Sequence, residues 1–138
     1  MVDRWKRASS ILGFDPTKIA GGLWASDSAY AQRSGVARKL SELMRLKEGW
    51  DGYRGRPLSP AVADRVHAIL ATCLADTGRY PSIVPGPSGD VQMEWHWGGI
   101  DLEVIVTERP MVEVWIGTDT VGDQGEAHSF ALPEVSAG

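Results

Sequence analysis

The chain has very little cysteine, no long hydrophobic run and none of the common catalytic signatures. Cys73 is its single cysteine, which excludes an intrachain disulfide and a metal cluster built from cysteines. We therefore expect a reducing, cytoplasmic setting. No apolar run reaches the about 18 residues that a membrane-spanning helix needs, and the basic N-terminus lacks the apolar stretch of a signal peptide. A phosphate-binding loop, a GxGxxG fingerprint and a nucleophile elbow are all missing, which argues against the common enzyme classes.

What the chain does have is enough material for one domain, with an uneven distribution of charge. It has 138 residues, of which 43% are hydrophobic and 23% charged, as in ordinary globular proteins. The net charge is −4, but residues 1–60 carry 11 Lys and Arg against 6 Asp and Glu, whereas residues 61–138 carry 3 against 12. The split indicates either two oppositely charged binding faces or two halves that neutralise each other within one fold. Nucleic acid binding by the acidic half is disfavoured.

The stretch from Val91 to Val106 predicts a β-hairpin with a defined register. Apolar residues alternate with polar ones on both sides of Gly98-Gly99, which supplies a two-residue turn. This turn fixes three cross-strand pairs: Trp97 with Ile100, His96 with Asp101, and Glu94 with Glu103. The exposed side of the hairpin therefore carries two carboxylates directly opposite each other, which is locally unfavourable, beside a His–Asp pair. Such an arrangement favours the presence of a binding partner.

Two amphipathic helices are predicted before the hairpin. The first covers residues 34–48, with Ser34 as its N-cap and Gly49 at its end. The second begins with Ser59 as N-cap and Pro60 as first helical residue, and it ends near residues 77–78. Residues 1–33 are too apolar for a solvated tail. We expect this N-terminal arm to pack on the domain or on a partner.

The remaining segments predict strands and turns. Residues 83–84 are expected to form a short edge strand, 111–116 a further main strand and 130–132 a last short strand, with a polar mobile loop over 117–129. The order of elements predicts an α+β fold, with two helices packed on one face of an antiparallel β-meander of three to five strands. The predicted domain covers residues 34–138, with both helices in 34–78 and the sheet in 81–132.

Several of these residues occur together in a known pattern. Gly49-Trp50-Asp51-Gly52-Tyr53, then Pro57, an amphipathic helix, Pro85, Gly89 and Glu94-Trp95 resemble a family of small, mostly uncharacterised prokaryotic and phage proteins. The resemblance covers about residues 36–106. It brings no established activity. It implies the fold given above and a role in conflicts that involve mobile elements, as an antitoxin, an immunity protein or an inhibitor of host defence such as an anti-CRISPR.

The outer face of the predicted sheet is the first candidate for a functional site. The residues that we expect to bind a partner there are Glu94, His96, Asp101, Glu103, Glu113 and Trp115. Aromatic and apolar side chains beside charges are typical of a protein interface. The carboxylates and the imidazole could instead hold a divalent cation, or one carboxylate with a raised pKa could serve in acid–base chemistry. A solvated face without a partner is the remaining interpretation.

Other residue groups have structural interpretations beside functional ones. The structural motif comprises Trp50, Asp51, Gly52 and Trp95; we expect Asp51 to accept backbone hydrogen bonds and Trp50 to close the core. Cys73 lies on the apolar stripe of the second helix and is expected to be buried. His67 and His128 have no triad partner at an informative spacing. A secondary basic patch, which could contact phosphates or an acidic partner, comprises Arg38, Lys39, Arg45, Lys47, Arg54 and Arg56.

The sequence favours a protein-binding module without catalysis, cofactor or bound metal. The predicted role is that of an inhibitor or neutraliser in a prokaryotic conflict system, with another protein as the partner. Two alternatives stay open: a metal-dependent hydrolase that uses Glu94, His96, Asp101 and Glu103, and a nucleic-acid-binding regulator that uses the basic N-terminal half. A homodimer also stays open, and no membrane association is expected.

Overall fold

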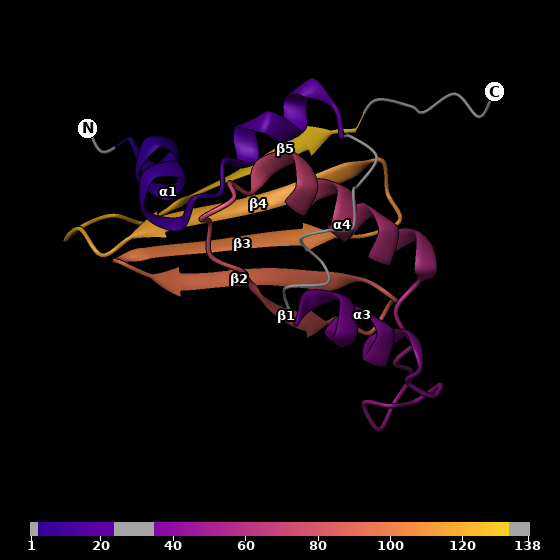
Figure 1. The fold of residues 1–138 in the computed structure, drawn as a ribbon. Coiled ribbons are helices and arrows are strands. Elements are labelled where there is room, and N and C mark those ends of the chain that lie inside the picture. The colour runs from indigo at the N-terminus through magenta and orange to yellow at the C-terminus, as the bar shows by residue number, and fades with distance from the viewer. Residues whose placement is uncertain (1–2, 24–34, 133–138) are drawn as a thin grey trace.

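A computed structural model of the chain describes residues 3–23 and 35–132 (Figure 1). Its elements in chain order are α1 (Arg4–Leu12), the 3-10 helix η1 (Pro16–Gly21), α3 (Val36–Met44), α4 (Pro60–Cys73), β1 (Ser82–Pro85), β2 (Val91–Trp97), β3 (Ile100–Val106), β4 (Met111–Thr118) and β5 (Glu126–Ala131). The five strands form one antiparallel sheet in the order β1-β2-β3-β4-β5, in which each strand pairs with its neighbours in sequence. The predicted α+β class and antiparallel meander are therefore confirmed.

The β2–β3 hairpin has the predicted register. Its pairs include Trp97 with Ile100, His96 with Asp101, and Glu94 with Glu103. The turn glycines have φ angles of +61° and +79°, which side chains disfavour. The apolar alternation of β2 includes Trp97, but this side chain is 52% exposed and does not continue the buried face. It lies at the end of β2, where the guanidinium of Arg79, 3.4 Å from the ring centroid, covers the indole in place of the core.

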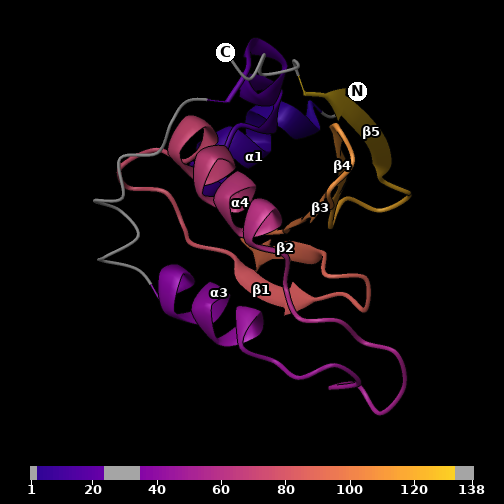
Figure 2. The same cartoon turned by 90° about the vertical axis from the view of Figure 1, so that its right-hand side faces the viewer.

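The helices and the sheet share one hydrophobic core. Figure 2 shows α1 and α4 on the concave side of the curved sheet, with α3 beside β1. The buried residues of β2, β3 and β4 occupy alternate positions, as expected for strands with one face in the core. They belong to the same hydrophobic cluster as the buried apolar residues of the described helices.

Residues 3–23 of the predicted N-terminal arm supply part of that core. Asp3 caps α1, because its carboxylate accepts a hydrogen bond from the backbone N–H of Lys6 at 3.0 Å. Phe14 is fully buried, and its ring centroid lies 4.4 Å from that of Trp95. Its backbone forms an isolated bridge with Leu74. In this part of the arm, α1 and η1 therefore add to the two predicted helices, whereas the rest of the arm and Ser34 lie outside the described residues.

Both predicted helices end earlier than expected. The first ends at Met44, because the backbone N–H of Leu58 bonds the carbonyl of Leu43 at 3.0 Å and draws the following segment back over the helix end. The second ends at Cys73, because Leu74 has an extended backbone and pairs with Phe14. Thus contacts with distant segments, rather than the glycines that follow, decide where these helices stop.

The predicted polar loop over residues 117–129 is shorter than expected, because strands take up both of its ends. β4 continues to Thr118 and β5 begins at Glu126, so the connection is short. Asp123 anchors it by accepting hydrogen bonds from the backbone N–H and hydroxyl of Thr118, at 2.8 and 2.6 Å, and from the N–H of Gly125 at 2.9 Å. The guanidinium of Arg4 bonds the same carboxylate. The connection is therefore an anchored turn.

Candidate functional site

The side of the sheet opposite to the core, which we call the outer face, carries an unbalanced charge. It is formed by alternate residues of the five strands, which are exposed or half-buried: Ser82, Val84, Gln92, Glu94, His96, Asp101, Glu103, Ile105, Met111, Glu113, Trp115, Ala127, Ser129 and Ala131. Four of these residues are carboxylates and one is a histidine, but these strand positions hold no lysine or arginine. All six predicted partner-binding residues lie on the outer face, and a negative potential over it follows.

His96 lies between two carboxylates at one end of the outer face. Its Nδ1 lies 2.7 Å from Oδ1 of Asp101, and its Nε2 lies 3.8 Å from Oε2 of Glu94. The hydrogen bond to Asp101, together with the charges of Asp101, Glu94 and Glu103, raises the pKa of His96 above its ordinary value. The charge of the outer face therefore changes in the pH range where this imidazole titrates.

Glu103 is the least compensated carboxylate of the hairpin. It faces Glu94 on β2 and Trp115 on β4. The amide of Gln92 donates a hydrogen bond of 2.6 Å to Glu94, whereas no side chain in the described part of the chain donates to Glu103. Like charges directly across a strand pair repel each other. A cationic group brought to Glu103 would relieve that repulsion.

Trp115 packs directly against two glycines. A Cβ atom at Gly117 would lie 2.7 Å from Cη2 of the indole, and one at Gly125 would lie 2.5 Å from its Cζ2. The ring thus occupies space that any other residue at these two positions would fill. The indole is half-buried, with Ile105 and Met111 as half-buried apolar residues on the same face. Aromatic side chains bind a partner with a small loss of conformational entropy, because they have few rotatable bonds.

The outer face does not assemble a metal site within the described residues. No group of three His, Cys, Asp or Glu side chains there is arranged to hold an ion. The predicted ligands Glu94, His96, Asp101 and Glu103 share the face, but Asp101 engages Nδ1 of His96. The geometry therefore favours a surface of separate charges over a coordination site.

The Trp50–Asp51 box forms a self-contained turn. Oδ1 of Asp51 accepts hydrogen bonds from the backbone N–H groups of Tyr53, at 2.9 Å, and Gly55, at 2.8 Å. These bonds, that from Gly55 first, lower the pKa of Asp51. The expected Asx-turn is thus confirmed. The expectation that Trp50 closes the core is wrong, because its Nε1–H bonds the carbonyl of Arg56 at 2.7 Å and the ring is not part of the hydrophobic cluster.

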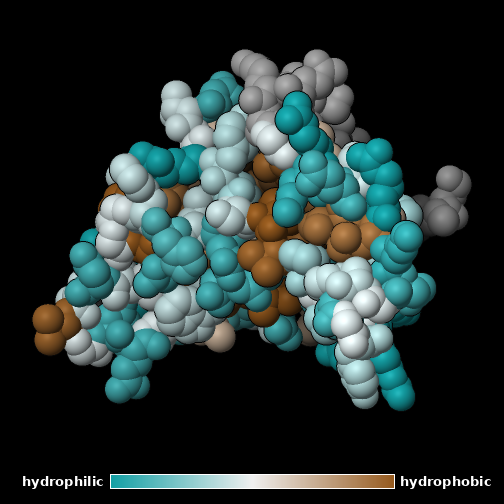
Figure 3. Space-filling model, turned by 90° about the horizontal axis from the view of Figure 1, so that it is seen from below, coloured by the Kyte–Doolittle hydropathy of each residue, from teal (hydrophilic) through white to brown (hydrophobic). Residues whose placement is uncertain are grey.

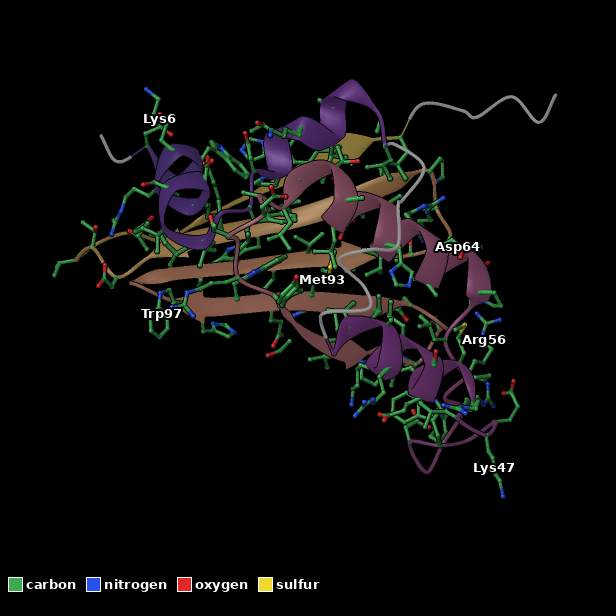
Figure 4. All side chains as sticks on the ribbon, viewed as in Figure 1. Lys6, Lys47, Arg56, Asp64, Met93 and Trp97 are labelled. Carbon is green, nitrogen blue, oxygen red and sulfur yellow. The ribbon has the colours of Figure 1, made fainter. Side chains whose placement is uncertain are left out.

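The predicted basic patch lies on α3 and on the segment between α3 and α4. Figure 4 shows Lys47 and Arg56 at the end of the molecule far from Trp97. Two of its six cations make hydrogen bonds within the fold, because Arg45 bonds the carbonyl of Ser41 at 3.3 Å and Arg56 bonds that of Ser88 at 2.9 Å. The patch is therefore partly structural.

Apolar surface accompanies this basic end. Seen from below, the side where α3 and β1 lie shows an apolar area among hydrophilic side chains (Figure 3). The exposed large hydrophobic residue of α3 is Met44, at 36%. Tyr53, in the neighbouring turn, is 77% exposed, and the guanidinium of Arg54 lies 5.4 Å from its ring centroid. This end is a second surface, separate in chemistry from the acidic outer face.

The remaining candidates have structural surroundings. Cys73 is buried as predicted, and burial raises the pKa of its thiol to about 12. His67 is half-buried, and burial lowers its pKa. His128 packs edge-on against Trp5, with ring centroids 5.1 Å apart, and its Nε2 lies 3.3 Å from Oε2 of Glu126. None of these surroundings indicates a catalytic role.

Asp123 is the buried charge that the sequence interpretation missed. Its side chain is only 3% exposed. The hydrogen bond from Arg4, together with those from Thr118 and Gly125, holds the pKa of its carboxyl well below the usual range. The sequence signal for this turn is Asp123 two residues before Gly125, which is a common turn pattern. Asp123 ties α1 to the β4–β5 turn and thereby supports the glycine under Trp115.

Comparison with protein-family models, with curated proteins and with solved structures finds no match to this chain. The resemblance to the small prokaryotic and phage family is therefore still a prediction. No helix among the described residues is long and apolar enough to cross a membrane.

Proposed function

We propose that the protein is a binding module that recognises a positively charged protein surface through its outer face. One observation carries the proposal: the outer face gathers Glu94, Asp101, Glu103 and Glu113 around Trp115, with no lysine or arginine among its strand positions. The helices α1 and α4 lie on the other side of the sheet (Figure 2). These two helices therefore do not cover the outer face.

The chemistry of the face supports a cationic protein as the partner. Lysine or arginine side chains would neutralise the opposed carboxylates, and complementary potentials speed association and select among partners. Trp115, Ile105 and Met111 offer an apolar centre within a polar rim, which is the usual anatomy of a protein interface.

The narrower role of an inhibitor, antitoxin or immunity protein in a prokaryotic conflict system is supported by the sequence resemblance alone. A cytoplasmic location belongs to the same proposal. In such a role the partner would be the toxin or the defence protein that is neutralised, and its contact surface would be basic.

The proposal is tested by capture from a prokaryotic lysate, followed by purification of the captured protein and direct measurement of binding. Three baits are compared: the wild type, the Glu103→Lys/Trp115→Ala variant and, as matched control, Tyr53→Ala/Arg54→Ala at the basic end. We expect one stoichiometric protein with the wild type and the control, and its loss with the outer-face variant. Equal capture by all three baits would refute the assignment of the outer face. Loss with the control alone would move the site to the basic end.

A further inference from the structure

The two edges of the sheet differ in the backbone groups that they offer. Beyond the last β4–β5 pair, the N–H of Leu132 donates to the carbonyl of Pro110 at 2.9 Å. Hydrogen-bonded and non-hydrogen-bonded pairs alternate along an antiparallel ladder. Glu126, His128 and Phe130 therefore direct their backbone groups toward β4. The groups that point to the free edge of β5 belong to Ala127, Ser129 and Ala131.

The opposite edge, at β1, is protected by proline. The N–H of Gly86 donates to the carbonyl of Asp90 at 3.0 Å, so the same alternation directs the backbone of Val84 and Ser82 toward β2. The outward positions are then Pro81, Ile83 and Pro85, and two of these three have no N–H to donate. Figure 2 also shows α3 beside β1. Both features are established means of preventing edge-to-edge pairing.

Within the described residues, the edge of β5 lacks the proline protection of β1, although η1 contacts this strand. The strand has six residues, EAHSFA, without proline or lysine. Ala127, Ser129 and Ala131 are all exposed, and their small side chains leave the backbone accessible. An exposed edge of this kind is a template for a further strand.

We infer that the β5 edge pairs with the β5 edge of a second copy of this chain, so that two sheets join across a two-fold axis. The edge is self-complementary about Ser129. Antiparallel pairing centred there places Ser129 opposite its own copy and Ala127 opposite Ala131, so small residues meet small residues. Glu126 then lies opposite Leu132, so no like charges oppose each other across the new ladder. This pairing does not rest on the outer-face proposal, because it uses the backbone groups of the β5 edge and not the carboxylates of the outer face.

The first test is the mass of the protein in solution, measured by light scattering over a concentration series. The wild type and Ser129→Ala, which keeps the N–H, should have twice the mass of one chain. Ser129→Pro should have the mass of one chain, because it removes the central outward N–H. A monomeric wild type at every concentration would overturn the inference, as would a Ser129→Pro dimer.

A second test keeps the inference falsifiable if Ser129→Pro does not fold. Opposed residues of a hydrogen-bonded pair have Cα atoms about 5.5 Å apart, so Ser129→Cys should be joined to its own copy by a short thiol crosslinker. Ser82→Cys, exposed on the opposite edge, is the control, and buried Cys73 contributes no background. Efficient crosslinking of Ser129→Cys alone supports the register. No covalent dimer, or equal crosslinking of both variants, contradicts it.

Discussion

The substitution Phe14→Ala tests whether the N-terminal segment is part of the core. Phe14 is fully buried, with 0% exposure. Its ring packs against that of Trp95, with 4.4 Å between the ring centroids. Truncating a buried phenylalanine costs about 3–5 kcal/mol of unfolding free energy, from lost burial and from the cavity that remains. That is a large part of the roughly 5–15 kcal/mol that stabilises a domain.

The assay is urea unfolding followed by tryptophan fluorescence, with Lys18→Ala as the matched control. Lys18 lies in the same segment but is exposed, so its truncation should change the unfolding free energy by less than about 0.5 kcal/mol. The melting temperature of Phe14→Ala should fall by roughly 10–20 °C. A loss for Phe14→Ala no larger than that for Lys18→Ala would refute the placement of residues 3–23 in the core.

Two further predictions concern the outer face. Asp101→Asn should lower the pKa of His96 toward its ordinary value of 6.5 in an NMR titration, because it removes the main cause of the upward shift. Because the folded-state pKa of His96 is raised, the His96–Asp101 pair stabilises the fold fully below pH 6.5. This contribution is lost as the pH rises through the folded-state pKa. An unchanged pKa of His96 in Asp101→Asn would contradict the geometry. Gly125→Ala should cost about 1–3 kcal/mol more than Gly122→Ala and alter the fluorescence of Trp115. Both glycines have positive φ, +74° and +85°, but only at Gly125 would a Cβ meet the indole, so equal costs would refute the contact.

The hairpin was predictable because its pattern is local. Gly98-Gly99 sets the turn and the alternation of apolar residues sets the faces, so together they fix which residues oppose each other. The carboxylates of the outer face followed directly from that register. Asp51 was predictable for the same reason, since its partners Tyr53 and Gly55 lie within four residues.

Other features depend on distant contacts and escaped the sequence interpretation. α1 is short, and the buried position of Phe14 depends on Trp95 and Leu74, which are far along the chain. β5 lacks an alternating hydrophobic pattern because two of its three core-side positions, Glu126 and His128, are polar, as suits an edge strand rather than a central one. The anchoring of Asp123 by Arg4 joins residues 119 positions apart, and no local pattern specifies such a pair.

Binding of a basic protein surface by the acidic outer face can be measured directly. The measurement is the affinity of the purified captured protein for the wild type, for Glu103→Lys/Glu113→Lys and for the control Arg54→Ala, each at low and high salt. We expect binding to the wild type and to the control that weakens with salt, and at least about tenfold weaker binding to the charge-reversed variant. Equal affinities for the wild type and the charge-reversed variant would contradict this expectation.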